Sequence, residues 1–408
     1  MVKKKLGFVG LGKLGMPCAE ALANKYKVYG YDNRKTYSKK IKILNSLKKL
    51  VYCSDIIFIA LPTPHHPKYD GSSPTSHLKN KDFSYTIVKN CIKKINTFAL
   101  NKKTIVLIST VLPGTVRKIL SKELTKCELI YNPYLIAMGS VGWDMVNPEM
   151  IIAGNKDAIK NRQIKEVFQI YKSVMKNKPR FVFGTWEEAE CIKIFYNTFI
   201  SAKIGLVNMI LDVSEKIQHI NVDVVTNALA NSKQRIMSSK YMTAGMGDGG
   251  ACHPRDNIAL RFLASSQRLG YDLFDAIMKA REVQAKNLAK KMISIAINNR
   301  MDVYIHGEAY KPLTPYKDGS YSLLVGHYIN NLYKKPVYID PHTRLKNPKS
   351  IKGVILMAHN SNVTYKEKKL HQQKLYSKIL DGSIVIDPWR NFKTNNKTIK
   401  VIHYGNTR

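Results

Sequence analysis

Gly10-Leu11-Gly12-Lys13-Leu14-Gly15 follows the apolar run 5–9 and precedes a stretch with helical periodicity. The three glycines have the spacing G-x-G-x-x-G. In this spacing the first two glycines allow a tight turn and the close approach of a pyrophosphate, and the third lets a helix pack on a strand. A strand, a glycine turn and a helix in this order predict an α/β domain that binds a dinucleotide.

Asp32 ends the next apolar run, 27–31. A carboxylate at this place accepts hydrogen bonds from a ribose diol and repels a 2′-phosphate, which favours NAD over NADP. Arg34 and Lys35 follow closely and can receive such a phosphate, so these two residues weaken the preference.

Apolar runs alternate with helical segments in the first half of the chain. The expected strands are 5–9, 27–31, 55–61, 104–109 and 128–131. One expected helix runs from the glycine loop to about Asn24, and two others lie near 84–98 and 114–124. This alternation predicts a parallel sheet covered by helices on both faces.

The pattern changes after Trp186, where long helical runs are expected at 187–217, 221–231 and 256–298. The alternation resumes from Asp302, with strands at 303–306, 336–340, 353–357 and 383–386 and helices near 320–333 and 364–378. The fold class predicted is α/β, with two Rossmann-like parallel-sheet domains, 1–185 and 299–408, joined by a helical domain, 186–298.

The chain is strongly basic, with 66 Lys and Arg against 29 Asp and Glu and a formal net charge of +37 among 408 residues. The lysines are spread along the chain, and they occur with abundant Asn and Ile. This mixture favours coding bias together with a polyanionic substrate, and the alternative is a protein that binds nucleic acid or another polyanion. Nucleic acid is the less favoured partner.

Six cysteines lie singly, without C-x-x-C spacing, which argues against a zinc site and against a disulfide framework. We therefore expect no metal and a reducing, cytoplasmic compartment. We also expect no membrane-spanning segment, because no apolar stretch is both long and free of charge, and no secretory signal at the amino terminus.

Cys252 closes the glycine-dense run 245–252, and Pro254 follows at once. Four glycines in six residues exclude a stable helix or strand, so the thiol is presented on tight turns. A helix that starts near Pro254 directs its positive end towards the sulfur, which favours a reactive thiolate. The alternative is a buried structural cysteine beside a loop.

Lys193, Asn197 and Asn208 project from one face of the helical run 187–217. Their neighbours are apolar, and a polar row among apolar residues is expected to line a cavity, because burial without partners is costly. The alternative is the solvated edge of an amphipathic helix.

The chain resembles the UDP-glucose/GDP-mannose dehydrogenase family over nearly its whole length. Besides the glycine loop and Asp32, the matching stretches are Leu61-Pro62-Thr63-Pro64, Asp82-Phe83-Ser84, Ser109 to Thr115, Tyr131-Asn132-Pro133, Asn147-Pro148, Lys193 to Thr198, Arg235-Ile236, Gly245 to Asp256, Ala309 to Pro312, Asp340-Pro341 and Asp387 to Arg390.

This resemblance implies an NAD-dependent, four-electron oxidation of the C6 alcohol of a nucleotide sugar to a carboxylate. Cys252 matches the nucleophile that forms a thiohemiacetal and then a thioester. Lys193 matches the residue that stabilises the oxyanion, and Asn197 its hydrogen-bonding companion. Asp256 matches the carboxylate that positions water, and Thr110 a residue that holds the catalytic water.

The resemblance also implies the binding residues and the partners. The cofactor contacts implied are Gly10, Gly12, Leu14, Gly15, Asp32, Pro62, Thr63 and Thr110. The substrate contacts implied are Lys193, Asn197, Asn208, Arg235, Tyr241, Gly249, Lys311 and Arg390. UDP-glucose is the substrate expected, and the helical domain is expected to form a homodimer to which Arg235 contributes across the interface.

The chain departs from the family pattern at several positions. Tyr134 stands where the family has a glutamate that acts as general base, and Met138 replaces a second acid. Tyrosine is a poor base near neutral pH, so an impaired or two-electron dehydrogenase is the alternative within the enzyme class. His253 replaces a common aromatic residue, Asp318-Gly319 replaces an Arg-Glu pair, and the connection after Asp32 is short.

Overall fold

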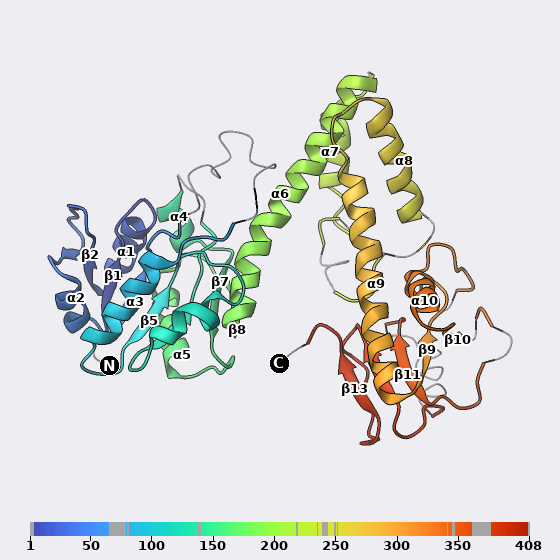
Figure 1. The fold of residues 1–408 in the computed structure, drawn as a ribbon. Helices are drawn as coiled ribbons and strands as arrows, with labels where there is room; N and C mark the ends of the chain where they lie inside the picture. The colour runs from blue at the N-terminus through green and yellow to red at the C-terminus, as the bar shows by residue number, and fades with distance from the viewer. Residues whose placement is uncertain are drawn as a thin grey trace. The chain divides into compact units, whose positions relative to one another are not determined.

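The computed structural model describes residues 4–64, 79, 81–136, 140–217, 219–234, 236–238, 244–248, 250, 252–312, 314–340, 342–344, 347–360 and 377–406. The chain divides into two compact units, Met1–Lys203 and Ile204–Arg408 (Figure 1). Each unit contains one sheet, and each is described by itself. The sequence-based division at residues 185 and 298 stays a prediction.

The first unit is built on an eight-stranded sheet with the order β3-β2-β1-β4-β5-β6-β7-β8. Its strands are β1 (Lys5–Val9), β2 (Lys27–Tyr31), β3 (Lys42–Ile43), β4 (Ile56–Ile59), β5 (Thr104–Leu107), β6 (Glu128–Tyr131), β7 (Met150–Asn155) and β8 (Arg180–Thr185). Its helices are α1 (Gly15–Ala23), α2 (Leu47–Cys53), α3 (Thr86–Phe98), α4 (Val141–Val146), α5 (Arg162–Val174) and the start of α6 (Trp186–Ile217).

Alternating residues of the central strands point to opposite faces of this sheet and form two apolar cores. Phe8 and Phe58 lie in the core that α1, α4 and α5 cover. Val9 and Ile57 lie in the core that α2, α3 and the start of α6 cover. The helices on both faces agree with the covered sheet that the alternation of strands and helices predicts.

The strands that the sequence predicts in this unit pair parallel, as expected, but the sheet continues beyond them at one edge, where β7 runs antiparallel to β6. The strands from β3 to β6 are all parallel. After β6 the chain turns back through α4 and enters β7 from the carboxyl end of β6, which reverses its direction. Strand β8 then pairs parallel with β7.

The segment 114–124, which is expected to be one helix, forms two short helical turns instead. It consists of a π-helical turn, η2 (Val116–Leu120), in which the N–H of Ser121 donates to the carbonyl of Val116, followed by a 3₁₀ turn, η3 (Ser121–Glu123). Such wide turns are rare and often occur at functional sites.

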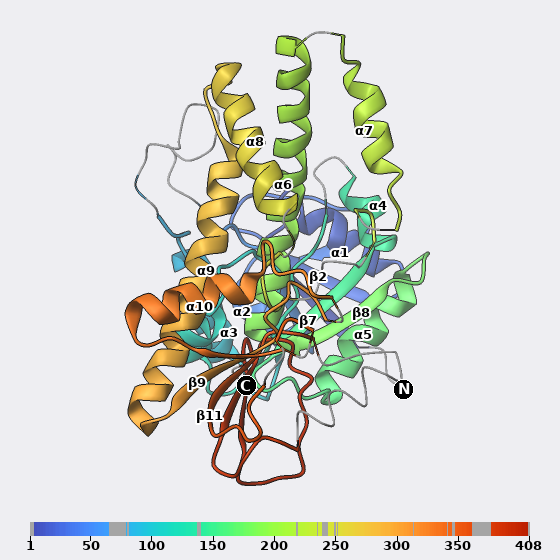
Figure 2. The same ribbon diagram turned by 90° about the vertical axis from the view of Figure 1, so that its right-hand side faces the viewer.

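The second unit contains the end of α6 and a five-stranded parallel sheet with the order β10-β9-β11-β12-β13. Its strands are β9 (Asp302–His306), β10 (Val337–Ile339), β11 (Gly353–Met357), β12 (Ile384–Asp387) and β13 (Lys400–His403), and its helices are α7 (Val222–Ala230), α8 (Cys252–Ser266), α9 (Leu273–Asn299) and α10 (Tyr321–Leu332). Helices α9 and α10 lie together on one face of this sheet (Figure 2).

Local sequence explains where the long helices begin and end. Thr185 and Glu188 form a reciprocal capping pair at the start of α6, with N···O distances of 2.8 and 3.2 Å. The carboxylate of Asp272 accepts hydrogen bonds from two N–H groups at the start of α9.

The single helical run expected at 256–298 consists of two helices, α8 and α9, because the chain turns at Arg268 and Gly270, both of which have positive φ. The helix expected at 364–378 falls almost wholly outside the described residues.

Helix α6 is long and apolar enough to cross a membrane by length and composition, since an 18-residue stretch of it has a mean hydropathy of 1.4. The expectation that no apolar stretch is long and charge-poor enough to span a membrane is therefore not met by α6. A helix in the core of a water-soluble protein can have the same length and composition.

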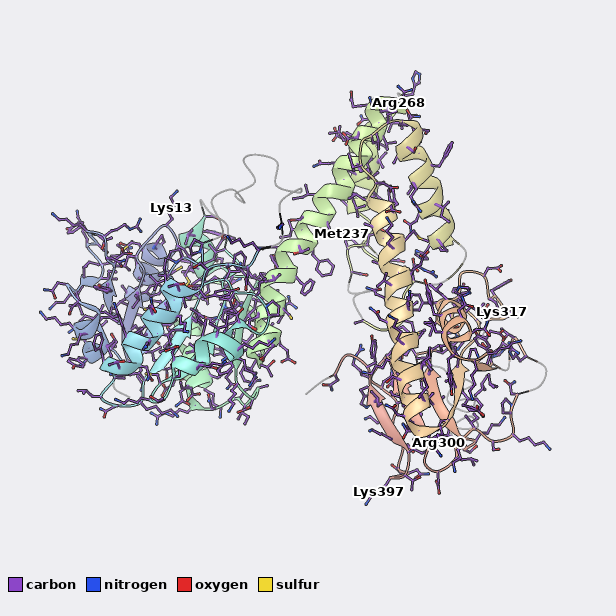
Figure 3. All side chains as sticks on the ribbon, in the orientation of Figure 1. Lys13, Met237, Arg268, Arg300, Lys317 and Lys397 are labelled. Atoms are coloured by element: carbon purple, nitrogen blue, oxygen red, sulfur yellow. The ribbon has the colours of Figure 1, made fainter. Side chains whose placement is uncertain are left out.

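The basic residues are spread over both units, as the sequence indicates, with Lys13 in the first unit and Lys317 and Lys397 in the second (Figure 3).

Candidate active site

The glycine loop has the geometry that its spacing predicts. Gly10 has a φ of +88°, and its N–H donates to the carbonyl of Tyr31 at 3.0 Å. A Cβ at Gly10 would lie 2.6 Å from the carbonyl oxygen of Ala60, and one at Gly15 would lie 1.9 Å from that of Gly10. Glycine is therefore required at both positions for the loop to pack against α1 and β4.

The outer side of this loop is open. A Cβ at Gly12 would meet only the Nη2 atom of Arg34, at 3.5 Å. Helix α1 follows directly, and no side chain caps its N-terminus at Leu14. Exposed glycine backbone before a free helix N-terminus is the arrangement that binds the pyrophosphate of a dinucleotide. The residues present therefore fit NAD.

Asp32 lies beside this loop at the end of β2. Its carboxylate accepts hydrogen bonds from the N–H of Leu11 at 2.7 Å and from the N–H of Arg34 at 2.9 Å. Partial burial raises the pKa of Asp32. The two hydrogen bonds and the Arg34 guanidinium together lower it by more, so the pKa is below its ordinary value. The group is therefore an anchored anion at neutral pH.

The ends of β4 and β5 complete the cofactor edge. The hydroxyl of Thr63 donates to the carbonyl of Thr110 at 2.7 Å, and the hydroxyl of Ser109 donates to the carbonyl of Leu61 at 2.6 Å. Pro62 lies exposed between Leu61 and Thr63. All the predicted cofactor residues thus lie at the carboxyl ends of β1, β2, β4 and β5, on one edge of the first sheet.

Lys193 reaches the same edge from α6. Its ammonium donates to the carbonyl of Tyr134 at 2.7 Å. Tyr134 follows the carboxyl end of β6, which is the neighbour of β5, and Asn132 before it pairs with Leu107 of β5. Burial lowers the pKa of Lys193, because it penalises the charged form. A partly desolvated cation at this edge is suited to stabilising an oxyanion.

The side chain of Tyr134 turns away from Lys193 into the core and is 8% exposed. Its hydroxyl lies 2.6 Å from the hydroxyl of Tyr171, which donates to the amide oxygen of Asn132. Burial raises the pKa of Tyr134 well above its ordinary value. The Tyr134 hydroxyl is therefore no general base, and the backbone carbonyl is the part of this residue that faces the ammonium.

Asn197 and Asn208 lie with Lys193 on the continuous helix α6, within about 60° of one another around its axis. Both asparagine side chains are exposed. Lys193 and Asn197 belong to the first unit and Asn208 to the second. The cavity that this row was expected to line stays a prediction.

In the second unit, Cys252 is the first residue of α8, and Asp256 is exposed one turn later. The side chain of Cys252 is outside the described part of the chain. The preceding glycines lie against aromatic rings, since a Cβ at Gly245 would be 2.5 Å from the ring of Trp389 and one at Gly247 would be 2.2 Å from that of Tyr321.

Asp248, in the same glycine run, binds the Nε of Arg281 at 2.5 Å. The Arg281 guanidinium also lies over the ring of Tyr321, 5.4 Å from its centroid. This ion pair and the aromatic contacts explain how a run without intrinsic helical or strand propensity is held in the second unit.

The predicted substrate residues of the second unit are only partly described. The guanidinium of Arg390 donates to the carbonyls of Ala244 at 2.5 Å and Tyr404 at 3.1 Å, so it ties the glycine run to the end of β12. Lys311 is exposed, with its ammonium 5.1 Å from the ring centroid of Tyr310. Arg235, Tyr241 and Gly249 lie outside the described residues, as does Met138.

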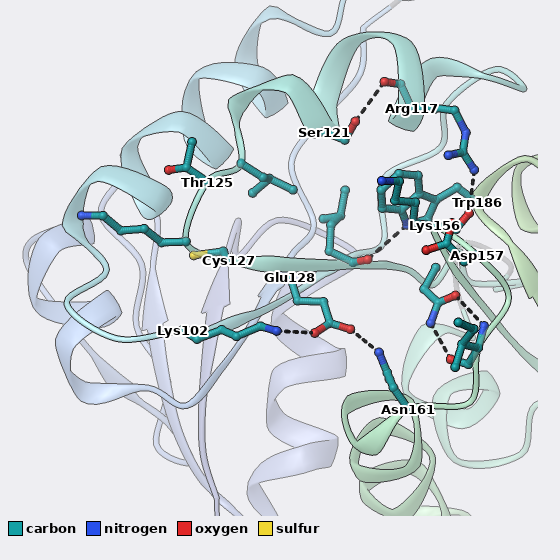
Figure 4. A pocket seen from close by; sticks show the side chains of 15 residues that line it. Lys102, Arg117, Ser121, Thr125, Cys127, Glu128, Lys156, Asp157, Asn161 and Trp186 are labelled. Atoms are coloured by element: carbon teal, nitrogen blue, oxygen red, sulfur yellow. Dashed lines mark hydrogen bonds and ion pairs between the residues drawn. The ribbon is translucent and has the colours of Figure 1, made fainter.

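A cavity of about 730 Å³ lies at the opposite, amino edge of the first sheet (Figure 4). Most of its polar lining is internally paired: Lys102 binds Glu128 at 3.3 Å, and Arg117 binds Glu187 at 2.5 Å. None of the predicted site residues lines this cavity. The sequence did not predict it, because its lining residues carry no motif.

Sequence reasoning also missed Glu190, which is buried on α6 and accepts hydrogen bonds from the N–H groups of Gly114 and Val116. The available signal was a carboxylate on the apolar stripe that contains Trp186 and Ala189, both of which are buried. A buried acid in such a stripe indicates a specific partner.

Comparisons with known proteins identify the family of this chain. The family model for the NAD binding domain of the UDP-glucose/GDP-mannose dehydrogenase family matches residues 30–172, and the model for its central domain matches residues 187–283. The first match begins after the glycine loop, so the loop and the model identify the same domain from different residues.

Two relatives are UDP-glucose 6-dehydrogenases. TuaD of Bacillus subtilis is 26% identical over 345 residues, which cover 76% of this chain and 70% of TuaD. The enzyme of Rickettsia prowazekii is 23% identical over 392 residues, which cover 95% of this chain and 82% of the relative.

A crystal structure of a GDP-mannose dehydrogenase from Pseudomonas aeruginosa shares the fold. It matches with a TM-score of 0.77 at 18% identity, and the match covers 97% of this chain and 99% of that one. The chain therefore belongs to the UDP-glucose/GDP-mannose dehydrogenase family and is an NAD-dependent enzyme of that family.

Proposed function

We propose that this enzyme oxidises the C6 hydroxyl of a nucleotide sugar to a carboxylate in two successive two-electron steps, with UDP-glucose as the substrate. The observation that carries the proposal is the partly desolvated Lys193 ammonium at the sheet edge that also contains the glycine loop. The substrate is supported by the two UDP-glucose 6-dehydrogenases among its relatives.

NAD, when bound, supplies a hydride acceptor for each oxidation. The open backbone at Gly12 would admit the pyrophosphate, and the anchored carboxylate of Asp32 would accept hydrogen bonds from the ribose hydroxyls. The hydrogen bond from the Thr63 hydroxyl to the carbonyl of Thr110 ties together the loops that follow β4 and β5 at this edge. These groups orient the cofactor and do not themselves react.

In the first oxidation the C6 alcohol loses a hydride and a proton and becomes an aldehyde. The Cys252 thiolate adds to the aldehyde carbon, and the resulting thiohemiacetal oxyanion loses a second hydride to become a thioester. Water then adds to the thioester carbonyl and the C–S bond breaks, which releases the carboxylate, the thiolate and two protons. Covalent capture prevents loss of the reactive aldehyde.

The other residues have supporting roles. Lys193 stabilises the oxygen anion that develops in both oxidations, because a preoriented cation acts strongly where water is excluded. Asn197 donates a hydrogen bond to the same oxygen. Thr110 and Asp256 position the hydrolytic water, which the buried hydroxyl of Tyr134 cannot do.

The test is to measure NADH formation with a panel of nucleotide sugars. Each sugar is assayed separately, at a limiting concentration. We expect two NADH per UDP-glucose, and a kcat/KM about tenfold or more lower for UDP-N-acetyl sugars and GDP-mannose, because a site built for one set of hydroxyls discriminates at least this well. UDP-xylose, which lacks the C6 hydroxymethyl group, is the matched control and should give no NADH. Absence of NADH with every sugar would refute the proposal.

An impaired enzyme is the second candidate, because Tyr134 leaves the family's base position without a base. Such an enzyme forms the thioester and hydrolyses it slowly. Intact-protein mass spectrometry after mixing with NAD and UDP-glucose distinguishes the two: a persistent sugar adduct on Cys252 supports slow hydrolysis, and an adduct-free enzyme during fast turnover excludes it.

Replacing Tyr134 by phenylalanine should leave kcat within about twofold of the natural enzyme, because the hydroxyl faces Tyr171 and not the site. Loss of this buried hydrogen bond should lower the free energy of unfolding by about 1 kcal/mol. Chemical denaturation and steady-state NADH formation measure the two effects. A tenfold fall in kcat would instead make the hydroxyl a catalytic group.

A homodimer and a cytoplasmic location complete the proposal. Apolar side chains of α6 are exposed in the single chain, for example Phe199 at 54%, and a second copy is the partner expected to cover them. The spread of basic residues over both units supports attraction of anionic substrates better than a dedicated nucleic-acid surface.

A further inference from the structure

Glu190 is a fully buried carboxylate (0% exposed) on α6, three residues before Lys193. One carboxylate oxygen accepts a hydrogen bond from the N–H of Gly114 at 2.5 Å, and the other from the N–H of Val116 at 2.8 Å. These N–H groups lie at the start of η2, where a carboxylate also interacts favourably with the helix dipole. The contact joins α6 to the loop that follows β5.

That loop, residues 108–115, presents Thr110. Its first part is attached to the end of β4 through Ser109 and Thr63. Its middle is attached to α3 through the Tyr85 hydroxyl, which accepts from the N–H of Leu112 at 3.3 Å. Glu190 attaches its last part by hydrogen bonds to the helix that carries Lys193.

We propose that Glu190 is a positioning residue for the dehydrogenase reaction: it holds the Thr110 loop in register with Lys193 through a single rigid helix. The inference rests on the proposed function, in which the loop orients water and the ammonium stabilises the oxyanion. Glu190 itself is enclosed, so it acts through the loop and not on the substrate.

The charge of Glu190 sets how well it can hold the loop. The groups that face it are Arg117 on η2, Glu187 and Cys191 on α6 and Tyr131 on β6. Burial raises the pKa of Glu190 to about 7, although the two N–H bonds oppose this shift. The ionised form accepts both bonds, whereas the protonated form turns an O–H towards one donor, so the loop is held best above pH 7.

The raised pKa of Glu190 affects the stability of the fold in the opposite direction to its hold on the loop. The folded pKa exceeds the ordinary value, so folding binds a proton in the window between the two. The contribution of Glu190 to stability therefore falls as pH rises from about 4.5 to about 7, while its hold on the loop improves. A residue that only stabilised the fold would not show these opposite trends.

The test is Glu190→Gln, with Glu188→Gln as the matched control, because Glu188 is an acid of the same helix whose carboxylate accepts a hydrogen bond from the N–H of Thr185. We expect Glu190→Gln to lower kcat about tenfold at pH 8, since small misplacements of reacting groups are costly, and to leave the KM for NAD within about twofold. It should also remove the rise of kcat near pH 7. An unchanged kcat and pH profile would overturn the proposal.

Hydrogen exchange of the natural enzyme tests the proposal without a variant. Protection of the amides of Gly114 and Val116, corrected for intrinsic exchange, should increase as pH rises from 6 to 8, and protection that stays flat would contradict the proposed role. This readout needs no turnover. Failure of the dehydrogenase assignment would appear as absent NADH, and failure of the Glu190 role as flat exchange.

Discussion

Replacing Cys252 by alanine is expected to reduce formation of the carboxylate product from UDP-glucose by at least about a thousandfold, because without the sulfur nucleophile the aldehyde is not captured and the second oxidation has no thiohemiacetal to act on. Cys252 begins α8, where the helix N-terminus favours a thiolate. Initial rates with saturating NAD and sugar measure the effect.

Cys127→Ala is the matched control for this variant. Cys127 is partly exposed and lines the cavity at the amino edge of the first sheet, away from the cofactor edge. Its replacement should leave the rate within about twofold, since surface changes away from a site are usually near neutral. Full turnover of the Cys252→Ala enzyme would remove Cys252 from the mechanism.

Replacing Lys193 by alanine should lower kcat by about a hundredfold to a thousandfold, the usual loss when one oxyanion-stabilising group is removed. Its ammonium is held at 2.7 Å from the carbonyl of Tyr134, so the charge is preoriented before substrate binds. The KM for NAD should change little. Lys216→Ala, an exposed lysine near the end of the same helix, is the control.

The pH dependence gives an independent check on Lys193. Burial lowers its pKa below the ordinary value, and the active form is the protonated one. The kcat of the natural enzyme should therefore fall with rising pH before an ordinary lysine would titrate. Lys193→Ala should lose this alkaline limb. A Lys193→Ala enzyme with unchanged kcat would show that the ammonium has no part in the reaction.

Local pattern was a good guide to the regular elements with strong periodicity. The expected strands at 27–31, 128–131 and 353–357 have the observed bounds, and the helix expected at 187–217 differs from α6 by one residue. Strands β7 and β8 and helix α5 were not predicted, although α5 has a clear apolar stripe. The antiparallel entry of β7 depends on where the preceding loop returns, which periodicity does not encode.

The candidate site was predicted in part. The glycine loop, Asp32 and the threonines were expected at one cofactor edge, and the structure brings them together there. Tyr134 was expected as a poor substitute for a base, and the structure shows a hydroxyl directed into the core. Residue type alone does not indicate which way a side chain turns, because that depends on the packing of α5 against the sheet.

By itself, the order of residues determined the glycine turn, the acid after the second strand, the single long helix and the placement of Cys252 behind four glycines. These are properties of neighbours along the chain, governed by backbone sterics and by side-chain periodicity. Only the tertiary structure decided that Lys193 binds the carbonyl of Tyr134 and that Glu190 holds Gly114. These contacts join residues 59 and 76 positions apart, and they form only when α6 packs against the folded sheet.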